Sequence, residues 1–416
     1  MQSIETVIIG GGQAGLAMSR SLRDHGIEHV LLERGDVGER WRNERWDSLR
    51  LLTPRWLSRL SGWNDDGADP HGFMHRLEVI AYLERYAEAF RAPVHAGVTV
   101  LGVERYGPGF RVDTDHGVWK ATNVVIATGE SQDAWTPDFA RDLAGSIHQV
   151  VSTGYRNPSQ LPDGGVLVVG ASATGIQLAE EIHASGRPVT LSVARHTRLP
   201  RTYRGRDILE WFHRMGVLDE RTGDVKNLGA SRAQPSMQLI GSLDHRTLDL
   251  GVLQRSGIRL VGMAVGACGR RMRFADDLVE SIAAAELKLA SLRLRIDRHI
   301  VAQGLGGEVA PSDPFVPVPL PDAPGVLDLE DRGIRTILWA TGFRRSYPWL
   351  RVPALDVRGE IMHTGGVTSE PGLYVLGLNF LRRRSSSFIA GVSKDADELV
   401  EHMSDLRSRR RPRAVA

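Results

Sequence analysis

Short runs of apolar residues alternate along the chain with longer stretches in which apolar residues recur at helical spacing. The first run, Thr6 to Ile9, ends in glycine, and a helical pattern follows from Leu16. Such continuous, β-branched runs are typical of strands that are buried on both faces of a parallel sheet. The same pattern recurs at 29–32, 123–127, 166–169, 188–193, 334–340 and 372–378. The chain is therefore predicted to have an α/β fold.

The first strand runs directly into a G-x-G-x-x-G turn, Gly10 to Gly15. Its first glycine allows a tight turn, the second lets the backbone approach a pyrophosphate, and the third lets helix and strand pack closely. Glu33 ends the second strand, 18 residues beyond Gly15, where a carboxylate can bind a ribose hydroxyl. We expect a dinucleotide site formed by Gly10, Gly12, Gln13, Ala14, Gly15, Glu33 and Arg34.

A second turn of the same kind, G-x-S-x-x-G, lies at 170–175 between a strand and a helix. Here the next strand ends in Arg195 instead of an acid, and a guanidinium can bind a 2′-phosphate that a carboxylate would repel. This pattern favours NADP over NAD; the alternative is that Arg195 is a solvated arginine at a strand end. The candidate residues of this site are Gly170, Ser172, Ala173, Thr174, Gly175, Arg195, His196 and Arg201.

Two later strands end in the same three residues, Ala-Thr-Gly, at 127–129 and 340–342. The first of these two strands is expected to cross beneath the first nucleotide site. The last strand ends at Gly377 and Leu378, and ligands of open α/β sheets bind beyond such strand ends. We therefore expect two Rossmann-like domains, one discontinuous (1–160 and 331–416) and one inserted (161–330, with a helical insert). Further cofactor contacts are expected at Val100, Ala127, Thr128, Gly129, Ala340, Thr341, Gly342, Gly377 and Leu378.

The segment after Glu33 is rich in glycine and tryptophan and is expected to be a loop that covers a bound group. Arg40 and Trp41 are candidate cofactor contacts, but Trp41, Trp46 and Trp56 could equally be core anchors. Position along the chain makes Arg50, Thr53 and Ser387 the candidate catalytic residues. Residues 276–298 predict a packed helix, charged on its outer face; a membrane-surface or dimer helix is the alternative.

Composition excludes several classes of protein. At 416 residues, with 42% hydrophobic and 25% charged residues, the chain is an ordinary globular protein of two or three domains. A net charge of +2 gives no reason to expect a nucleic-acid partner, and the basic run 407–413 is more simply a frayed terminus than a binding arm. Cys268 is the one cysteine, so no disulfide framework or Cys-ligated zinc is expected, nor any metal site. We expect a cytoplasmic protein without membrane segments.

Taken in order, these motifs resemble those of class B flavin-containing monooxygenases, which are related to Baeyer–Villiger and N-hydroxylating enzymes. The resemblance includes the Gly38-Glu39-Arg40-Trp41 loop and the Ala340-Thr341-Gly342-Phe343 ending, and it covers nearly the whole chain. It implies FAD at the first turn and NADPH at the second. The reduced flavin would react with O2 to give a C4a-(hydro)peroxide, which passes one oxygen atom to the nitrogen, sulfur or carbonyl group of a small substrate. The protein is expected to be a monomer or a homodimer.

The chain departs from the family pattern in the linker before the second turn, where Val151 takes the position of a histidine associated with NADPH use. An NADPH oxidase or a flavin or quinone reductase without oxygen transfer therefore stays a rival. A disulfide reductase is rejected because Cys268 has no cysteine partner. A non-catalytic nucleotide-sensing protein is the third alternative.

Overall fold

In a computed structural model, which describes residues 1–63, 69–320 and 322–410, the first glycine turn belongs to a nine-stranded sheet. Its main path runs β21-β22-β23-β6-β1-β2-β3, and β4 and β5 extend it from β6. β1 pairs in parallel with β2 and β6, and β23 pairs in parallel with β6. The strands are β1 (Gln2–Ile9), β2 (His29–Leu32), β3 (Val94–His95), β4 (Val100–Tyr106), β5 (Gly109–Thr114), β6 (Gly117–Ile126), β21 (His363–Thr364), β22 (Val367–Thr368) and β23 (Leu373–Val375).

The second glycine turn belongs to a five-stranded parallel sheet in the order β15-β10-β9-β19-β8. Its strands are β15 (Arg259–Val261), β10 (Val189–Ser192), β9 (Gly165–Val169), β19 (Ile334–Trp339) and β8 (His148–Val151). The predicted α/β class with parallel strands is confirmed.

Two of these strands fall outside the expected inserted range of 161–330. β8 precedes that range and β19 follows it, yet β19 pairs with both β8 and β9. The pairing is physically reasonable, because β19 is buried along nearly its whole length and needs a neighbour on each edge. The five-stranded sheet therefore draws on residues 148–339, and the exact division into domains stays a prediction.

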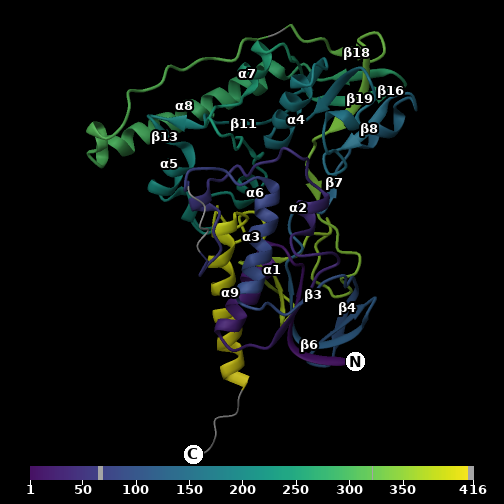
Figure 1. Cartoon of the computed structure of the whole chain (residues 1–416), viewed down its shortest axis with the longest axis vertical. Coiled ribbons are helices and arrows are strands. Elements are labelled where there is room, and N and C mark those ends of the chain that lie inside the picture. The colour runs from purple at the N-terminus through teal and green to yellow at the C-terminus, as the bar shows by residue number, and fades with distance from the viewer. Residues whose placement is uncertain (64–68, 321, 411–416) are drawn as a thin grey trace, which may run out of the picture.

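A helix follows each glycine turn, and another covers most of the range 276–298 that was predicted to be helical. α1 (Gln13–Asp24) packs along α9 (Ile389–Arg410), so the last helix of the chain lies beside the first (Figure 1). α3 (Arg76–Ala89) accompanies them, whereas α4 (Ala173–Ala184) and α8 (Leu278–Ala302) belong to the other half of the molecule (Figure 1). The shorter helices are α2 (Glu39–Asn43), α5 (Ile208–Arg214), α6 (Leu228–Arg232) and α7 (Leu250–Arg255).

Small ribbons complete the fold. β7 (Asp133–Ala134) pairs with β20 (Phe343–Arg344) where the chain leaves and re-enters the first half of the molecule. The others are β11 (Thr197–Arg198) with β14 (Met237–Gln238), β12 (Thr202–Tyr203) with β13 (Arg206–Asp207), and β16 (Ala264–Cys268) with β17 (Arg271–Phe274) and β18 (Val326–Asp328).

Each half of the molecule has its own core, built from the sheet and the helices that cover it. Ile8, Leu16 and Leu399 are fully buried in the first, and Val168, Ile176 and Leu191 in the second. Trp46 is buried in the second core, while Trp41 packs against both. Among the described residues, no helix has the length and hydropathy to cross a bilayer. The basic run at 407–413 lies partly outside the described residues.

Candidate functional site

The first glycine turn is shaped by close backbone contacts. Gly10 has φ +113°, and a Cβ there would lie 2.6 Å from the carbonyl oxygen of Ala127. A Cβ on Gly15 would lie 1.8 Å from the carbonyl oxygen of Gly10, so only glycine fits both positions. Gly12 differs, since a Cβ there would meet no protein atom within 4 Å. The space beside Gly12 is therefore free for a ligand.

Helix α1 begins directly after Gly12, and no side chain caps its first N–H groups. Uncapped N–H groups at a helix N-terminus bind phosphate well, because the helix dipole adds to their hydrogen bonds. Glu33 lies beside the turn and is nearly buried: its Oε2 accepts a hydrogen bond from the Gly11 N–H at 2.5 Å and its Oε1 one from Gly35 at 3.1 Å. The structure thus brings the predicted acid and the predicted turn together, in an arrangement that fits a dinucleotide.

The second glycine turn repeats this geometry. Gly170 has φ +109°, and a Cβ on Gly175 would lie 1.7 Å from the Gly170 carbonyl oxygen. Ser172, which takes the place of Gly12, precedes α4 without capping it through its side chain. The chain therefore builds two separate glycine turns whose geometry suits a phosphate, each at the carboxyl end of a buried parallel strand.

The two Ala-Thr-Gly motifs support different turns. Ala127 follows β6 and contacts Gly10, whereas Ala340 follows β19, and its carbonyl oxygen lies 2.4 Å from where a Cβ of Gly170 would be. We expected residues 331–416 to belong to the first domain, but Ala340, Thr341 and Gly342 lie at the second turn. The reason is the sheet order, because β19 is the direct neighbour of β9.

The C-terminal segment returns to the first turn, as its strand pattern predicts. β23 lies beside β6, and a Cβ on Gly377 would come within 2.7 Å of the Ala14 Cβ. The Gln13 side-chain amide donates to the carbonyl oxygen of Ser387 at 2.9 Å. Gly377, Leu378 and Ser387 are thus brought to the N-terminus of α1, across 374 residues of sequence.

The loop after Glu33 is tied to the end of β6. Arg40 pairs with Glu44 at 2.9 Å and donates to the carbonyl oxygens of Ser131 and Gln132. Burial lowers the pKa of the Arg40 guanidinium. Arg34 also pairs with Glu44, at 2.8 Å, and points to the surface. Arg40 thus holds the loop against the segment that follows Ala127-Thr128-Gly129, and Trp41 packs against both cores.

Arg50 and Thr53 use their polar atoms to hold their own segment. Arg50 donates to the Phe73 carbonyl oxygen at 2.9 Å, and the Thr53 hydroxyl hydrogen-bonds the Ser58 hydroxyl at 2.7 Å. Their proposed catalytic role stays a prediction. Val100 opens β4, but the backbone contacts with the Glu33 strand come from Gly97 and Val98, which donate to the Gly35 and Glu33 carbonyl oxygens.

The three candidates after β10 lie in different environments. Arg195 is exposed and makes no hydrogen bond or ion pair with any residue in the described part of the chain. His196 is buried, its Nδ1 lies 3.0 Å from the Ala194 carbonyl oxygen, and burial lowers its pKa. Arg201 is buried and pairs with Asp207 at 2.5 Å. The structure thus corrects the predicted cluster: Arg195 is free to meet a ligand, whereas Arg201 is committed to the interior.

Sequence reasoning missed a junction of five residues, Glu130, Arg232, Arg345, Asn379 and Phe380, which we call the Glu130 junction. Glu130 accepts a hydrogen bond from the Asn379 N–H and lies 3.6 Å from Arg345. Arg232, on α6, donates to the Phe380 carbonyl oxygen at 3.1 and 3.2 Å. Phe380 has φ +46°, a rare conformation for a non-glycine residue. The helical insert therefore meets the carboxyl ends of β6 and β23 here.

Burial raises the pKa of Glu130 to about 7. A carboxyl group that titrates near neutrality, at the carboxyl edge of a nucleotide-binding sheet, is a candidate functional group. The signal was present in the sequence, because Glu130 directly follows Ala127-Thr128-Gly129. Asn379 and Arg232 carried no such signal, since only the tertiary fold brings them to it.

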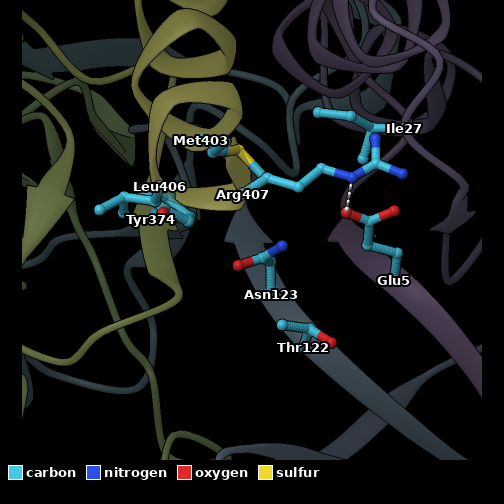
Figure 2. A pocket seen from close by; sticks show the side chains of 8 residues that line it. All are labelled: Glu5, Ile27, Thr122, Asn123, Tyr374, Met403, Leu406 and Arg407. Atoms are coloured by element: carbon cyan, nitrogen blue, oxygen red, sulfur yellow. Dashed lines mark ion pairs between the residues drawn. The ribbon is translucent and has the colours of Figure 1, made fainter. Parts of the chain in front are cut away.

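A separate cavity of about 190 Å³ lies at the opposite edge of the first sheet (Figure 2). Glu5, Thr122 and Asn123 line it, and Arg407 closes one side through an ion pair with Glu5 at 3.3 Å. Glu5 is five residues before the glycine turn, about 16 Å along an extended strand. This cavity is therefore not part of either nucleotide turn.

Cys268 is exposed at the end of β16, in a small sheet apart from both turns. Over residues 1–63, 69–320 and 322–410, no three His, Cys, Asp or Glu side chains gather where they could hold a metal ion.

Comparison with known proteins matches these features. The model of the pyridine nucleotide-disulphide oxidoreductase family fits residues 7–208. A CzcO-like oxidoreductase of Geobacillus kaustophilus is 33% identical over 401 residues, covering 95% of this chain and 97% of that protein. The probable indole-3-pyruvate monooxygenase YUCCA4 of Arabidopsis thaliana is 24% identical over 416 residues, covering 96% and 89%. The flavin-containing monooxygenase of Stenotrophomonas maltophilia has a similar fold, with a TM-score of 0.68 at 21% identity, covering 98% of this chain and all of that one.

Proposed function

The chain belongs to the CzcO-like oxidoreductases, within the flavin-containing monooxygenase superfamily, and from that premise we propose that it is an FAD- and NADPH-dependent monooxygenase. It transfers one oxygen atom from O2 to a nitrogen, sulfur or carbonyl centre of a small organic substrate. The observation that carries the proposal is the pair of uncapped glycine turns, one in each sheet, backed by Ala127 and Ala340. Two dinucleotide sites in one chain fit an enzyme that passes electrons from a nicotinamide to a flavin.

FAD binds at the first turn. The α1 N-terminus holds its pyrophosphate beside Gly12, and Glu33 accepts hydrogen bonds from its ribose. Gln13 supports this arrangement, since its amide ties α1 to the Ser387 carbonyl at 2.9 Å. Gly377 and Leu378 pass the same helix and cover the cofactor. We also propose that Arg50, Thr53 and Ser387 lie beside the flavin and are the catalytic residues.

NADPH binds at the second turn. The α4 N-terminus after Ser172 takes the pyrophosphate, and the exposed Arg195 guanidinium takes the 2′-phosphate. No acid ends β10, so a phosphorylated ribose is not repelled there. Held by these residues, NADPH would supply the hydride for a flavin bound at the first turn, which would in turn react with O2. The protein contributes orientation, shielding from water and hydrogen bonds around the cofactors.

Oxygen transfer is supported by two of the similar proteins, a probable indole-3-pyruvate monooxygenase of a plant and a flavin-containing monooxygenase of a bacterium. The rival is an NADPH oxidase or a flavin or quinone reductase. One observation favours it: Val151 lies in β8 and pairs with Trp339, just before Ala340, where the family pattern has a histidine. A valine side chain there cannot donate or accept a hydrogen bond.

The experiment that separates the two functions measures coupling. Purified flavoprotein is supplied with NADPH and O2, and both NADPH oxidation and H2O2 release are followed. A thioether, a tertiary amine and a cyclic ketone serve as probes. With at least one probe, we expect H2O2 released per NADPH to fall while an oxygenated product accumulates. One H2O2 per NADPH with every probe, and no product, would establish the oxidase instead.

A further inference from the structure

Helix α8 has an apolar stripe on each of two opposite faces. The inner stripe is fully covered and packs on the second half of the molecule. It consists of Leu278, Ile282, Ala285, Leu289, Ile296 and Ile300. A helix of 25 residues with this inner stripe needs no second apolar face to stay folded.

The outer stripe faces solvent. Leu287, Leu294 and Val301 follow one another at seven-residue spacing, and 72%, 57% and 80% of their surfaces are exposed. Small residues, Ala284 and Ser291, fill the same side between them. The sequence favoured a packed helix with a charged outer face and left a membrane-surface or dimer helix as the alternative, and this exposed stripe supports that alternative. Seven-residue spacing of this kind is typical of a seam between two helices.

A neighbouring loop widens the apolar surface. The backbone N–H of Val318 donates to Glu286 at 2.7 Å, and Arg293 donates to the Ser312 hydroxyl at 3.3 Å. These two hydrogen bonds hold the loop 312–318 along α8. Phe315 and Val316 lie between these anchors and are also exposed. The loop therefore places two further exposed apolar side chains beside the flank of α8 that carries Glu286 and Arg293.

The charges at the two ends of the stripe are opposite. Glu280 lies near its beginning and Arg298 near its end, both exposed and on the side of Leu287 and Leu294. Neither side chain has an ion-pair partner within the described residues. Glu280 and Arg298 are therefore placed so that each can meet the other on a second copy turned end to end, as a two-fold symmetric interface requires. The opposed helix dipoles add to this complementarity.

We propose that this face of α8 binds a second copy of the chain in antiparallel orientation, with the two-fold axis near Ser291. Leu287 then packs on Leu294 of the second copy, and Glu280 lies within one helical turn of Arg298 of the second copy. Two-fold symmetry repeats each of these contacts. The nucleotide turns lie on other elements, so dimerisation does not depend on the proposed reaction.

Sedimentation equilibrium of the FAD-loaded protein tests the proposal. Leu287→Glu with Leu294→Glu should raise the dimer dissociation constant at least tenfold, whereas Val357→Glu, an exposed apolar control on another surface, should leave it unchanged. Glu280→Arg or Arg298→Glu alone should weaken the dimer, and both changes together should restore it. Retained flavin content shows that each variant is folded.

Cross-linking tests the orientation in a Cys268→Ser background. A short bis-maleimide should join two copies of Ser291→Cys, which lie beside the axis. It should not join two copies of Val301→Cys, which lie about 30 Å apart in an antiparallel pair. Linkage of both variants would indicate parallel helices and contradict the proposal. A monomer at all concentrations, a dimer indifferent to both charged leucine replacements, or binding of α8 to anionic vesicles without dimerisation would each overturn it.

Discussion

At the scale of single residues, the sequence predicted best where the backbone itself dictates the residue type. Gly10, Gly15, Gly170 and Gly175 are needed because a Cβ would strike a carbonyl oxygen at each position. Arg201 was predicted poorly, because a guanidinium near a strand end has the same sequence pattern whether it is free or buried. Its partner Asp207 comes from a ribbon that only the fold places there.

Arg195 gives a prediction about cofactor choice. This guanidinium is exposed and without a partner in the described chain, so its replacement by alanine should remove the charge-assisted contact that we propose with the 2′-phosphate. We expect the KM for NADPH to rise roughly tenfold or more while the KM for NADH changes little. Steady-state kinetics with both nucleotides measure this. Arg332→Ala, an exposed arginine at the opposite end of β19, serves as the control. Equal effects on both nucleotides would refute the assignment.

Glu130 gives a prediction about pH. Because burial raises its pKa from 4.5 to about 7, its neutral form stabilises the folded state. That stability is complete below pH 4.5 and is lost as the pH rises through 7. Glu130→Gln stays neutral at every pH. Its free energy of unfolding should therefore rise relative to that of the wild type between pH 4.5 and pH 7, by an amount on the order of 2 kcal/mol. Urea unfolding of both proteins at a series of pH values measures this difference. A difference in unfolding free energy that does not change with pH would contradict the raised pKa of Glu130.

At the scale of elements, strands and long helices were predictable because burial imposes a period on their residues. The pairing of the strands was not predictable, because an apolar run does not indicate which strand lies beside it. β19 shows this: its run of buried residues was correct, but its place beside β9 was not foreseen. The outer face of α8 was missed for a related reason, because Leu287 and Leu294 fit a buried pattern as well as an exposed seam.

The start of α9 gives a prediction about stability. Arg383 and Asp395 form a buried ion pair at 2.8 Å, and Arg383 also reaches Glu398. Asp395→Ala leaves a buried guanidinium short of a partner, so the free energy of unfolding should fall by roughly 3 kcal/mol. Asp397→Ala, an exposed neighbour on the same helix, should change it by less than about 0.5 kcal/mol. Urea denaturation compares the two variants. Similar losses of unfolding free energy would show that the buried ion pair contributes no more to stability than an exposed carboxylate.

At the scale of the whole molecule, the order of motifs predicted two nucleotide sites, and the fold provides two matching turns. The C-terminal return was also predictable, because β23 and α9 complete the sheet and helix layer that β1 and α1 begin. The Glu130 junction could not be predicted. It joins β6, α6 and the segment after β23, three parts of the chain that no local pattern connects.

The most direct test of the account is anaerobic reduction of the bound flavin by NADPH, followed by its absorbance near 450 nm in the wild type and two variants. Gly12→Val is tolerated by the protein, since no atom lies within 4 Å of the new Cβ, but it should abolish FAD binding. Ser172→Tyr should keep FAD and slow its reduction by NADPH at least a hundredfold. The wild type should bleach fully with one equivalent of NADPH. A wild-type protein that cannot be loaded with FAD, or whose flavin NADPH does not reduce, would contradict the central claim.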